Sequence, residues 1–209
     1  SPEKTAIIAE TGPMVYIANE MTPFSGSDVV VFSNCDEVKL KVFKNGKEFI
    51  HKKDKAEKGM PSPPIVFKDV YHFLDIKALH RNKKEREAYL VVEGLMNGKV
   101  VATDTVRSAL RPEKIVLSID NEGVDLKADG SDFVTVIAAV TDKQGNVKRL
   151  NNSIIKFEIS GEGSIIGDEA FIANPKQLNW GTAPILVQSS TNPGTITIKA
   201  SMFYKGTLK

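Results

Sequence analysis

Residues 88–107 read AYLVVEGLMNGKVVATDTVR, and this stretch decides the fold class. Two runs of apolar and β-branched residues, at 88–93 and 99–107, flank the dipeptide Asn97-Gly98. β-branched residues favour strands, and Asn-Gly between two such runs is the strongest short-range hairpin signal. The stretch therefore predicts two antiparallel strands joined by a tight turn.

The same alternation of short strand-forming runs and turn residues continues along the chain. Asn45-Gly46 separates the runs at 38–44 and 48–52, and Asn192-Pro193-Gly194 separates the runs at 183–190 and 195–201. Further runs lie at residues 5–9, 14–19, 28–33, 65–70, 114–120, 132–141 and 154–160. Residues 74–88 contain good helix formers, but their apolar residues stop at Leu79, so we expect at most a short helical turn there. The pattern predicts an all-β protein.

The run at residues 132–141 (DFVTVIAAVT) shows how the strands are arranged. Alternate residues of a strand point to opposite faces, and both faces of this run are largely apolar. We therefore expect a central strand of a sandwich. The run at 195–201 alternates Ile196 and Ile198 with Thr and Lys, which predicts one buried and one solvated face.

Length and a proline together predict the domain organisation. The chain has 209 residues, 41% of them apolar and 26% charged, which is an ordinary globular composition for one or two domains. Arg111-Pro112 lies between two groups of strands, and a residue before proline is biased towards extended geometry. We therefore expect one domain at residues 1–111 and a second at residues 112–209.

Composition excludes several functional classes. The formal net charge is +2, and the basic stretches at 52–55 and 81–86 are interrupted by acids, so we expect no nucleic-acid partner. The longest apolar runs fall short of the roughly 18 residues of a transmembrane helix, so we expect no membrane insertion. The chain begins without Met and without a signal-peptide layout, which indicates a mature form or an excised fragment.

Candidate catalytic and cofactor-binding residues are few. His51, His72 and His80 match no local metal pattern, and the chain has no P-loop or GxGxxG motif, so we expect no cofactor. Cys35 is the single cysteine and can form neither an internal disulfide nor a zinc site. It follows a strand-forming run, and we interpret it as a small, partly buried residue rather than a nucleophile.

Two features of the second half suggest binding. Asp125, Asp129 and Asp132, with Asp120, are the most concentrated carboxylates, and they could form a calcium site or could act as turn and capping residues. Trp180, the single tryptophan, precedes a strand and could be a flat platform for a sugar. The alternative interpretation of Trp180 is a buried plug at one end of the sandwich, and we favour it because tryptophan is usually well buried.

Several motifs, taken in order, resemble the C-terminal domains of glycoside hydrolase family 2, especially its β-galactosidase-like members. The first group resembles the β-sandwich domain that follows the catalytic barrel: residues 13–19 (PMVYIAN), 29–38 (VVVFSNCDEV) and 45–47 (NGK). Residues 104–108 (DTVRS) and 114–118 (KIVLS) resemble the crossing into the last domain. The last group resembles the immunoglobulin-like C-terminal domain: residues 128–132 (ADGSD), 142–146 (DKQGN), 161–163 (GEG) and 193–196 (PGTI).

This resemblance implies an all-β chain of two tandem antiparallel immunoglobulin-like β-sandwiches. The family resemblance implies retaining hydrolysis by two glutamates on the catalytic barrel. A barrel of this kind needs about 250 residues and does not fit in this chain. We therefore expect no catalytic residue in this sequence. The expected partner is the catalytic domain of the same polypeptide, in a scaffolding role. A carbohydrate-binding module that holds polysaccharide and an adhesin-type spacer are the alternatives. A periplasmic or extracellular location is implied by the resemblance alone.

Overall fold

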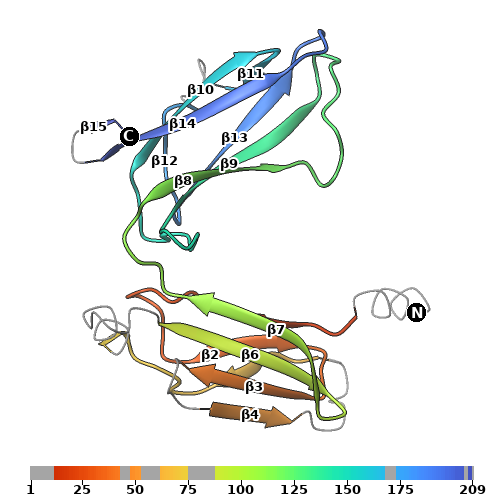
Figure 1. The fold of residues 1–209 in the computed structure, drawn as a ribbon, viewed down its shortest axis with the longest axis vertical. Helices are drawn as coiled ribbons and strands as arrows, with labels where there is room; N and C mark the ends of the chain where they lie inside the picture. Colours follow the sequence, from red (N-terminus) through yellow and green to blue (C-terminus); the bar gives the residue numbers. More distant parts are fainter. Residues whose placement is uncertain are drawn as a thin grey trace. The chain divides into compact units, whose positions relative to one another are not determined.

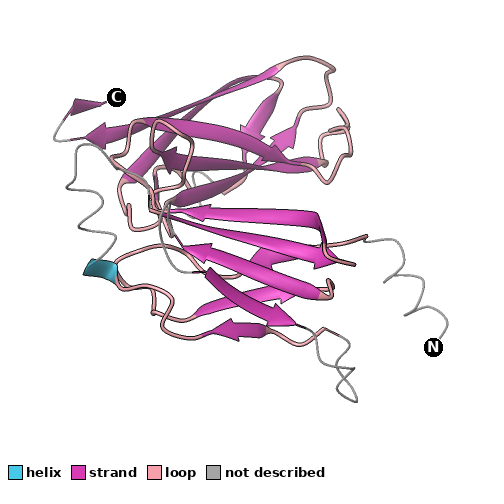
Figure 2. Ribbon diagram, turned by 60° about the horizontal axis from the view of Figure 1, so that its bottom comes forward, coloured by secondary structure: helices cyan, strands magenta, loops and turns pink. Residues whose placement is uncertain are grey.

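The computed structural model describes residues 12–42, 48–52, 62–74, 88–167, 173–204 and 207–208. The chain divides into two compact units, Ser1–Ser108 and Ala109–Lys209, called unit 1 and unit 2 below (Figure 1). This division falls slightly before Arg111-Pro112, where the sequence placed the boundary. Strands form nearly all of the described secondary structure, and Phe73 and Leu74 form a short helical segment, drawn in cyan in Figure 2. The prediction of an all-β fold is confirmed.

Unit 1 consists of two antiparallel sheets with a shared apolar core. The smaller sheet has the order β1-β2-β5, with β1 at Val15–Ile17, β2 at Val29–Ser33 and β5 at Ile65–Phe67. The larger sheet has the order β4-β3-β6-β7, with bounds Glu48–Lys52, Glu37–Val42, Tyr89–Met96 and Lys99–Arg107. Alternate residues of both sheets, such as Val29, Val31, Leu40 and Leu90, are completely buried and form one cluster. The arrangement is a β-sandwich.

The two predicted hairpins of unit 1 are present. Asn97 and Gly98 have φ angles of 48° and 73°, and Met96 pairs with Lys99 around them. Positive φ at both central residues is the requirement of a type I′ turn, which explains why Asn-Gly stands there. β3 and β4 pair antiparallel from Glu37↔Lys52 to Lys41↔Glu48, while Asn45-Gly46 lies outside the described residues.

An aspartate joins the two sheets of unit 1 at their edges. The side-chain Oδ2 of Asp104 in β7 accepts a hydrogen bond of 2.8 Å from the backbone amide of Ile17 in β1. Its Oδ1 accepts a second bond of 2.8 Å from the amide of Thr105. Asp104 thus satisfies a backbone donor that the edge strand β1 would otherwise leave without a strand partner.

Unit 2 is a second antiparallel sandwich. One sheet has the order β11-β13-β9-β8, with bounds Gly163–Ile165, Thr182–Ser189, Phe133–Thr141 and Lys114–Asp120. The other has the order β12-β10-β14-β15, with bounds Lys176–Gln177, Ile154–Gly161, Ile196–Tyr204 and Thr207–Leu208. Residues of both sheets, among them Val140, Ile155 and Phe157, form its core cluster.

The strand positions and faces predicted from the sequence agree with the structure of unit 2. β9 lies between β13 and β8, which confirms the prediction of a central strand for residues 132–141. In β14, Ile196 and Ile198 are partly buried against the core, whereas Thr197 and Lys199 are exposed. The short strands β11, β12 and β15 were not predicted, because runs of two or three residues carry no periodicity. The strand predicted at residues 5–9 lies outside the described residues.

Candidate functional site

Trp180 occupies a tight turn at the start of β13. Asn179 and Thr182 exchange backbone hydrogen bonds of 2.8 and 3.1 Å, and the two residues between them, Trp180 and Gly181, have φ angles of 51° and 74°. Position 181 requires glycine for two reasons. Its φ is positive, and a Cβ there would lie 2.4 Å from the carbonyl oxygen of Lys148. The indole of Trp180 is 56% exposed, so its interpretation as a buried plug is wrong.

The carboxylates of Asp129 and Asp132 accept hydrogen bonds from backbone amides of their own loop. Asp129 Oδ1 accepts hydrogen bonds from the backbone amides of Ser131 and Asp132, both at 2.8 Å, and from the Ser131 hydroxyl at 2.9 Å. The amide bonds are the main reason why the pKa of Asp129 lies below its usual value. Asp132 Oδ2 accepts a bond of 2.9 Å from the amide of Lys127. These oxygens stabilise the loop itself.

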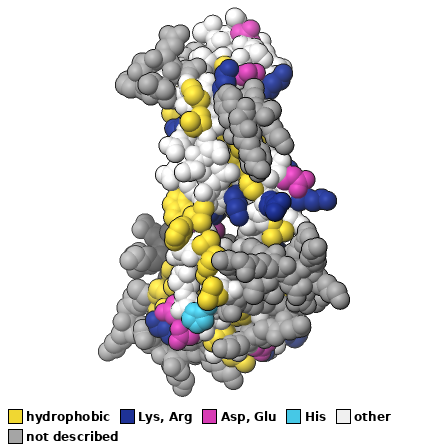
Figure 3. Space-filling view, turned by 90° about the vertical axis from the view of Figure 1, so that its left-hand side faces the viewer, with side chains coloured by type: hydrophobic (Ala, Val, Ile, Leu, Met, Phe, Trp, Pro, Cys, Tyr) yellow, Lys and Arg dark blue, Asp and Glu magenta, His cyan; other side chains and the backbone are white. Residues whose placement is uncertain are grey.

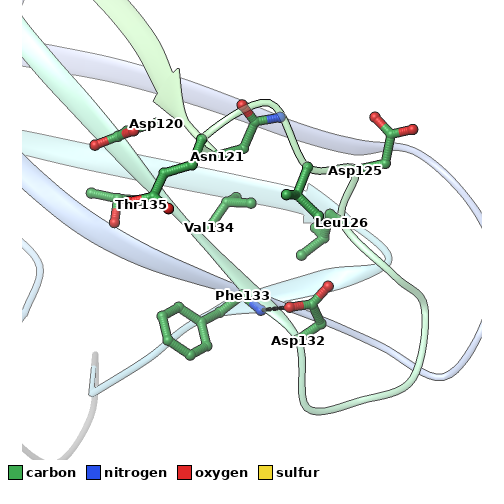
Figure 4. Close-up of a pocket in the computed structure, with 10 residues that line it drawn as sticks. Asp120, Asn121, Asp125, Leu126, Asp132, Phe133, Val134 and Thr135 are labelled. Carbon is green, nitrogen blue, oxygen red and sulfur yellow. Dashed lines mark hydrogen bonds between the residues drawn. The ribbon is translucent and has the colours of Figure 1, made fainter. Parts of the chain in front are cut away.

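The same end of unit 2 contains a shallow hollow of about 360 Å³. Its lining includes Asp120, Asp125 and Asp132, together with apolar residues such as Val124 and Val134. Figure 4 shows the three carboxylates at separate corners of the hollow, where they do not converge. Among the described residues, no group of three or more His, Cys, Asp or Glu side chains could hold a metal ion. The structure therefore does not bring the three predicted calcium ligands Asp125, Asp129 and Asp132 together as a coordinating group.

Asp142 is the most densely bonded carboxylate of the described chain and is fully buried. It accepts hydrogen bonds from the backbone amides of Leu110, Gln144 and Asn146 at 2.9, 3.0 and 2.9 Å, and from the Asn146 side chain at 3.0 Å. Burial raises the pKa of this carboxyl, but these bonds together outweigh burial and hold the pKa below its usual value. Asp142 thus fastens the segment that enters unit 2 to the loop after β9.

Lys148 also holds the segment that enters unit 2. Its ammonium donates a hydrogen bond of 3.0 Å to the carbonyl oxygen of Ala109. Burial lowers the pKa of Lys148, and the nearby carboxylate of Asp142 opposes that effect. Asp142 and Lys148 therefore both have structural partners within unit 2, and we assign the two residues a structural role.

The outer face of the small sheet in unit 1 is unusually apolar. Tyr16 and Phe32 pair directly across β1 and β2, and Val30 and Val66 pair across β2 and β5. Tyr16, Phe32 and Val66 are exposed. Antiparallel sheets that cover a core with one face normally have a polar outer face. Hydrophobic side chains also reach the surface on the side of the molecule drawn in Figure 3.

The remaining candidate residues are the single cysteine and the three histidines. Cys35 is only 3% exposed, so it is buried more deeply than predicted, and it lies against Gly94. His51 is part of β4, His72 follows β5, and His80 lies outside the described residues. Among the described residues, no helical segment has the length and the apolar composition of a membrane-spanning helix.

Two consecutive antiparallel β-sandwiches define this protein's class, and comparisons with known proteins identify the family. Residues 115–204 match the family model described as glycoside hydrolase family 2 C-terminal domain 5. A β-galactosidase of Thermoanaerobacter pseudethanolicus is 32% identical over 200 residues, which cover 92% of this chain and 25% of that protein. A β-galactosidase of Rhizobium meliloti is 27% identical over 146 residues, covering 66% of this chain and 18% of the relative.

Solved structures agree on the fold. A β-glycosidase from Bacteroides vulgatus superposes with a TM-score of 0.69 at 20% identity, covering 97% of this chain and 24% of that one. A family 2 glycosyl hydrolase from Bacteroides cellulosilyticus gives a TM-score of 0.65 at 22% identity, covering 92% and 28%. The chain belongs to the C-terminal region of β-galactosidase-like proteins of glycoside hydrolase family 2. It spans about a quarter of the length of the first of these relatives.

Sequence reasoning missed the apolar outer face of unit 1. The signal was present in the run VVVFS of β2. Residues that point to either face of this strand are apolar, although the strand belongs to a small sheet. A run that is apolar on both faces predicts cover on both sides. The core of unit 1 covers the inner face of the small sheet. The outer face, formed by Tyr16, Val30, Phe32 and Val66, is a candidate contact surface.

Proposed function

We propose that this chain is a non-catalytic accessory region of a β-galactosidase-like glycoside hydrolase. Its role is to pack against the catalytic part of the same polypeptide and support it. Retaining hydrolysis uses two carboxyl groups about 5–5.5 Å apart across a sugar site. The carboxylates that the described part concentrates at Asp129, Asp132 and Asp142 are engaged with backbone amides instead.

The apolar outer face of the small sheet supports this proposal. Exposed apolar patches on soluble proteins mark surfaces that contact other proteins, and aromatic residues are enriched at the centres of such contacts. Tyr16 and Phe32 form such an aromatic pair, with Val30 and Val66 beside them. The rest of the longer polypeptide is the natural occupant, because the first relative is about four times as long as the aligned region.

Lysine substitutions in the full-length polypeptide test the contact. We expect Phe32→Lys to lower the thermal midpoint of the catalytic part and its galactosidase activity, because a charge would have to be buried against that part. Val101→Lys is the matched control, because Val101 is exposed to a similar degree on the other sheet of unit 1. Equal effects of the two substitutions would contradict a contact through the small sheet.

The non-catalytic role has a separate test. The purified 209-residue chain should not hydrolyse a chromogenic galactoside, whereas the full-length polypeptide should do so under the same conditions. Hydrolysis by the folded chain alone would refute the accessory role. This assay is independent of where the chain contacts the catalytic part.

Carbohydrate binding is the second candidate function, and the exposure of Trp180 favours it. The tight turn holds the indole outward just before β13, where an apolar sugar face could stack on it. Calorimetric titration with galactosides and polysaccharides should then show binding that Trp180→Ala removes. Phe133→Ala is the control, because Phe133 has a similar exposure at the opposite end of the same sheet. Unchanged binding in Trp180→Ala would exclude the indole.

A further inference from the structure

β8 is an edge strand whose outer backbone edge pairs with no other described strand. It runs from Lys114 to Asp120 and pairs with β9 alone, in an unbroken register over its 7 residues. Figure 1 shows β8 at the border of its sheet in unit 2. At the opposite border, β11 has only 3 residues. β8 therefore offers a long, regular backbone edge to which a further strand can be added.

The edge of β8 lacks most of the features by which proteins prevent such pairing. Very short strands, prolines, bulges and inward-pointing charges keep an exposed edge from adding a strand. β8 contains no proline, and its register with β9 shows no bulge. Its two charged residues, Lys114 and Asp120, occupy the two ends of the strand rather than its middle. The edge is therefore open to another strand along its whole length.

The inward-pointing side chains of β8 are apolar and incompletely covered. Leu117 and Ile119 pair with Ala138 and Val136 of β9, which are buried, so the two β8 residues lie on the core-facing side of the sheet. Leu117 is nevertheless 36% exposed and Ile119 is 65% exposed. A strand added at this edge would place its own side chains beside both residues and remove their apolar surface from water.

We propose that the free edge of β8 pairs with β8 of a second copy of this chain. The two-fold axis is perpendicular to the sheet and passes through Leu117, so the two strands run antiparallel and all 7 residues of each strand are paired. In this register Leu117 lies opposite Leu117 of the second copy. Ile115 lies opposite Ile119, and Lys114 lies opposite Asp120, each of the second copy. The two four-stranded sheets become one continuous sheet.

The sequence of β8, KIVLSID, is complementary to itself in this register. The two-fold axis creates two Lys114–Asp120 pairs, one at each end of the joined strands. Opposite charges and apolar side chains that lie directly opposite each other stabilise an antiparallel strand pair. Moving the axis to Val116 or to Ser118 shortens the pairing and places Lys114 opposite Ser118, or Asp120 opposite Val116. Charge complementarity therefore favours a second copy of this chain, in the register centred on Leu117.

The proposed dimer uses a different surface from the contact proposed above. The contact with the catalytic part uses the small sheet of unit 1, whereas the dimer uses the edge of β8 in unit 2. Neither proposal depends on the other, and separate substitutions distinguish them.

Charge reversal tests the register. The 209-residue chain should be a reversible dimer in sedimentation equilibrium. Lys114→Asp and Asp120→Lys each place like charges opposite each other at both ends, so each should raise the dissociation constant of the dimer at least about tenfold. The double variant exchanges the two charges and should return to within about threefold of the native value. Lys143→Asp is the matched control, because it makes the same charge change at an exposed turn position of unit 2.

A cross-linking experiment tests the same contact by its geometry. In a Cys35→Ala background, Leu117→Cys places two cysteines directly opposite each other, with Cβ atoms about 4.5–5.5 Å apart. Val116→Cys is the control, because Val116 is similarly exposed but lies diagonal to its own copy, about 7–8 Å away. A disulfide needs Cβ atoms about 3.5–4.5 Å apart. Mild oxidation should therefore cross-link Leu117→Cys several-fold faster than Val116→Cys.

Three results would overturn the proposal. In the first, the native chain is a monomer at millimolar concentration. In the second, the charge variants of β8 weaken the dimer no more than Lys143→Asp, or the double variant fails to restore it. In the third, Phe32→Lys dissociates the dimer and the charge variants leave it intact, which would place the interface on the small sheet of unit 1 instead.

Discussion

Replacing Asp142 by alanine should lower the stability of unit 2 more than any single substitution at its surface. Asp142 is fully buried and accepts hydrogen bonds from the backbone amides of Leu110, Gln144 and Asn146. Alanine leaves all three donors without this acceptor. An unsatisfied buried donor costs about 1–3 kcal/mol. Gln144 is exposed and can turn to water, whereas the bond to Leu110 is partly buried. We therefore expect a loss of about 3 kcal/mol in the free energy of unfolding.

Urea denaturation followed by the emission of Trp180 measures this loss. Trp180 is the single tryptophan and belongs to unit 2, so its emission reports on the unit that contains Asp142. Lys143→Ala is the control, since Lys143 is the exposed neighbour of Asp142 and should change stability by less than about 0.5 kcal/mol. A loss of similar size in both variants would refute the assignment of Asp142 as the fastening point of the entering segment.

The pH dependence of Asp142→Asn gives a second test of the same reasoning. The folded pKa of Asp142 lies below its usual value, so the carboxylate contributes stability above the unfolded pKa of about 3.9. That contribution is lost as the pH falls through the folded pKa. Asparagine cannot ionise, so the stability difference between the native chain and Asp142→Asn should be constant near neutral pH and should shrink below about pH 4. A difference that does not change with pH would contradict a charged Asp142.

Two further predictions concern unit 1. Gly94→Ala places a methyl group 2.6 Å from the Cys35 sulfur, so it should lower the stability of unit 1 by about 1–3 kcal/mol. Adding Cys35→Ala should restore part of this loss. Denaturation of the single and double variants shows whether the effects of the two substitutions are coupled. Asp104→Ala removes the acceptor of the Ile17 amide, so it should cost about 1–2 kcal/mol and accelerate exchange of that amide. Exchange of the Ile17 amide at the native rate would show that the edge of β1 does not depend on Asp104.

The sequence alone determined the longer strands of this protein and the turn at Asn97-Gly98. Asn97-Gly98 favours a type I′ turn through its own backbone preferences, and the alternation of Ile196 and Ile198 with polar residues defines the two faces of β14. These are local effects, because φ preferences and the direction of side chains depend on a few neighbouring residues. Residues 132–141 could likewise be recognised as a central strand from their composition alone.

Only the tertiary structure decided what each candidate residue does. Trp180 was expected to be buried because most tryptophans are, but the positive φ angles of its turn direct the indole outward. Asp125, Asp129 and Asp132 are close in sequence, yet the path of the loop keeps them from forming one coordinating group. The bond between Asp142 and Leu110 joins residues 32 positions apart. Ile119 shows the same limit, because it pairs with the buried Val136 of β9 but is itself 65% exposed. Short-range patterns in the sequence carry no information about that exposure.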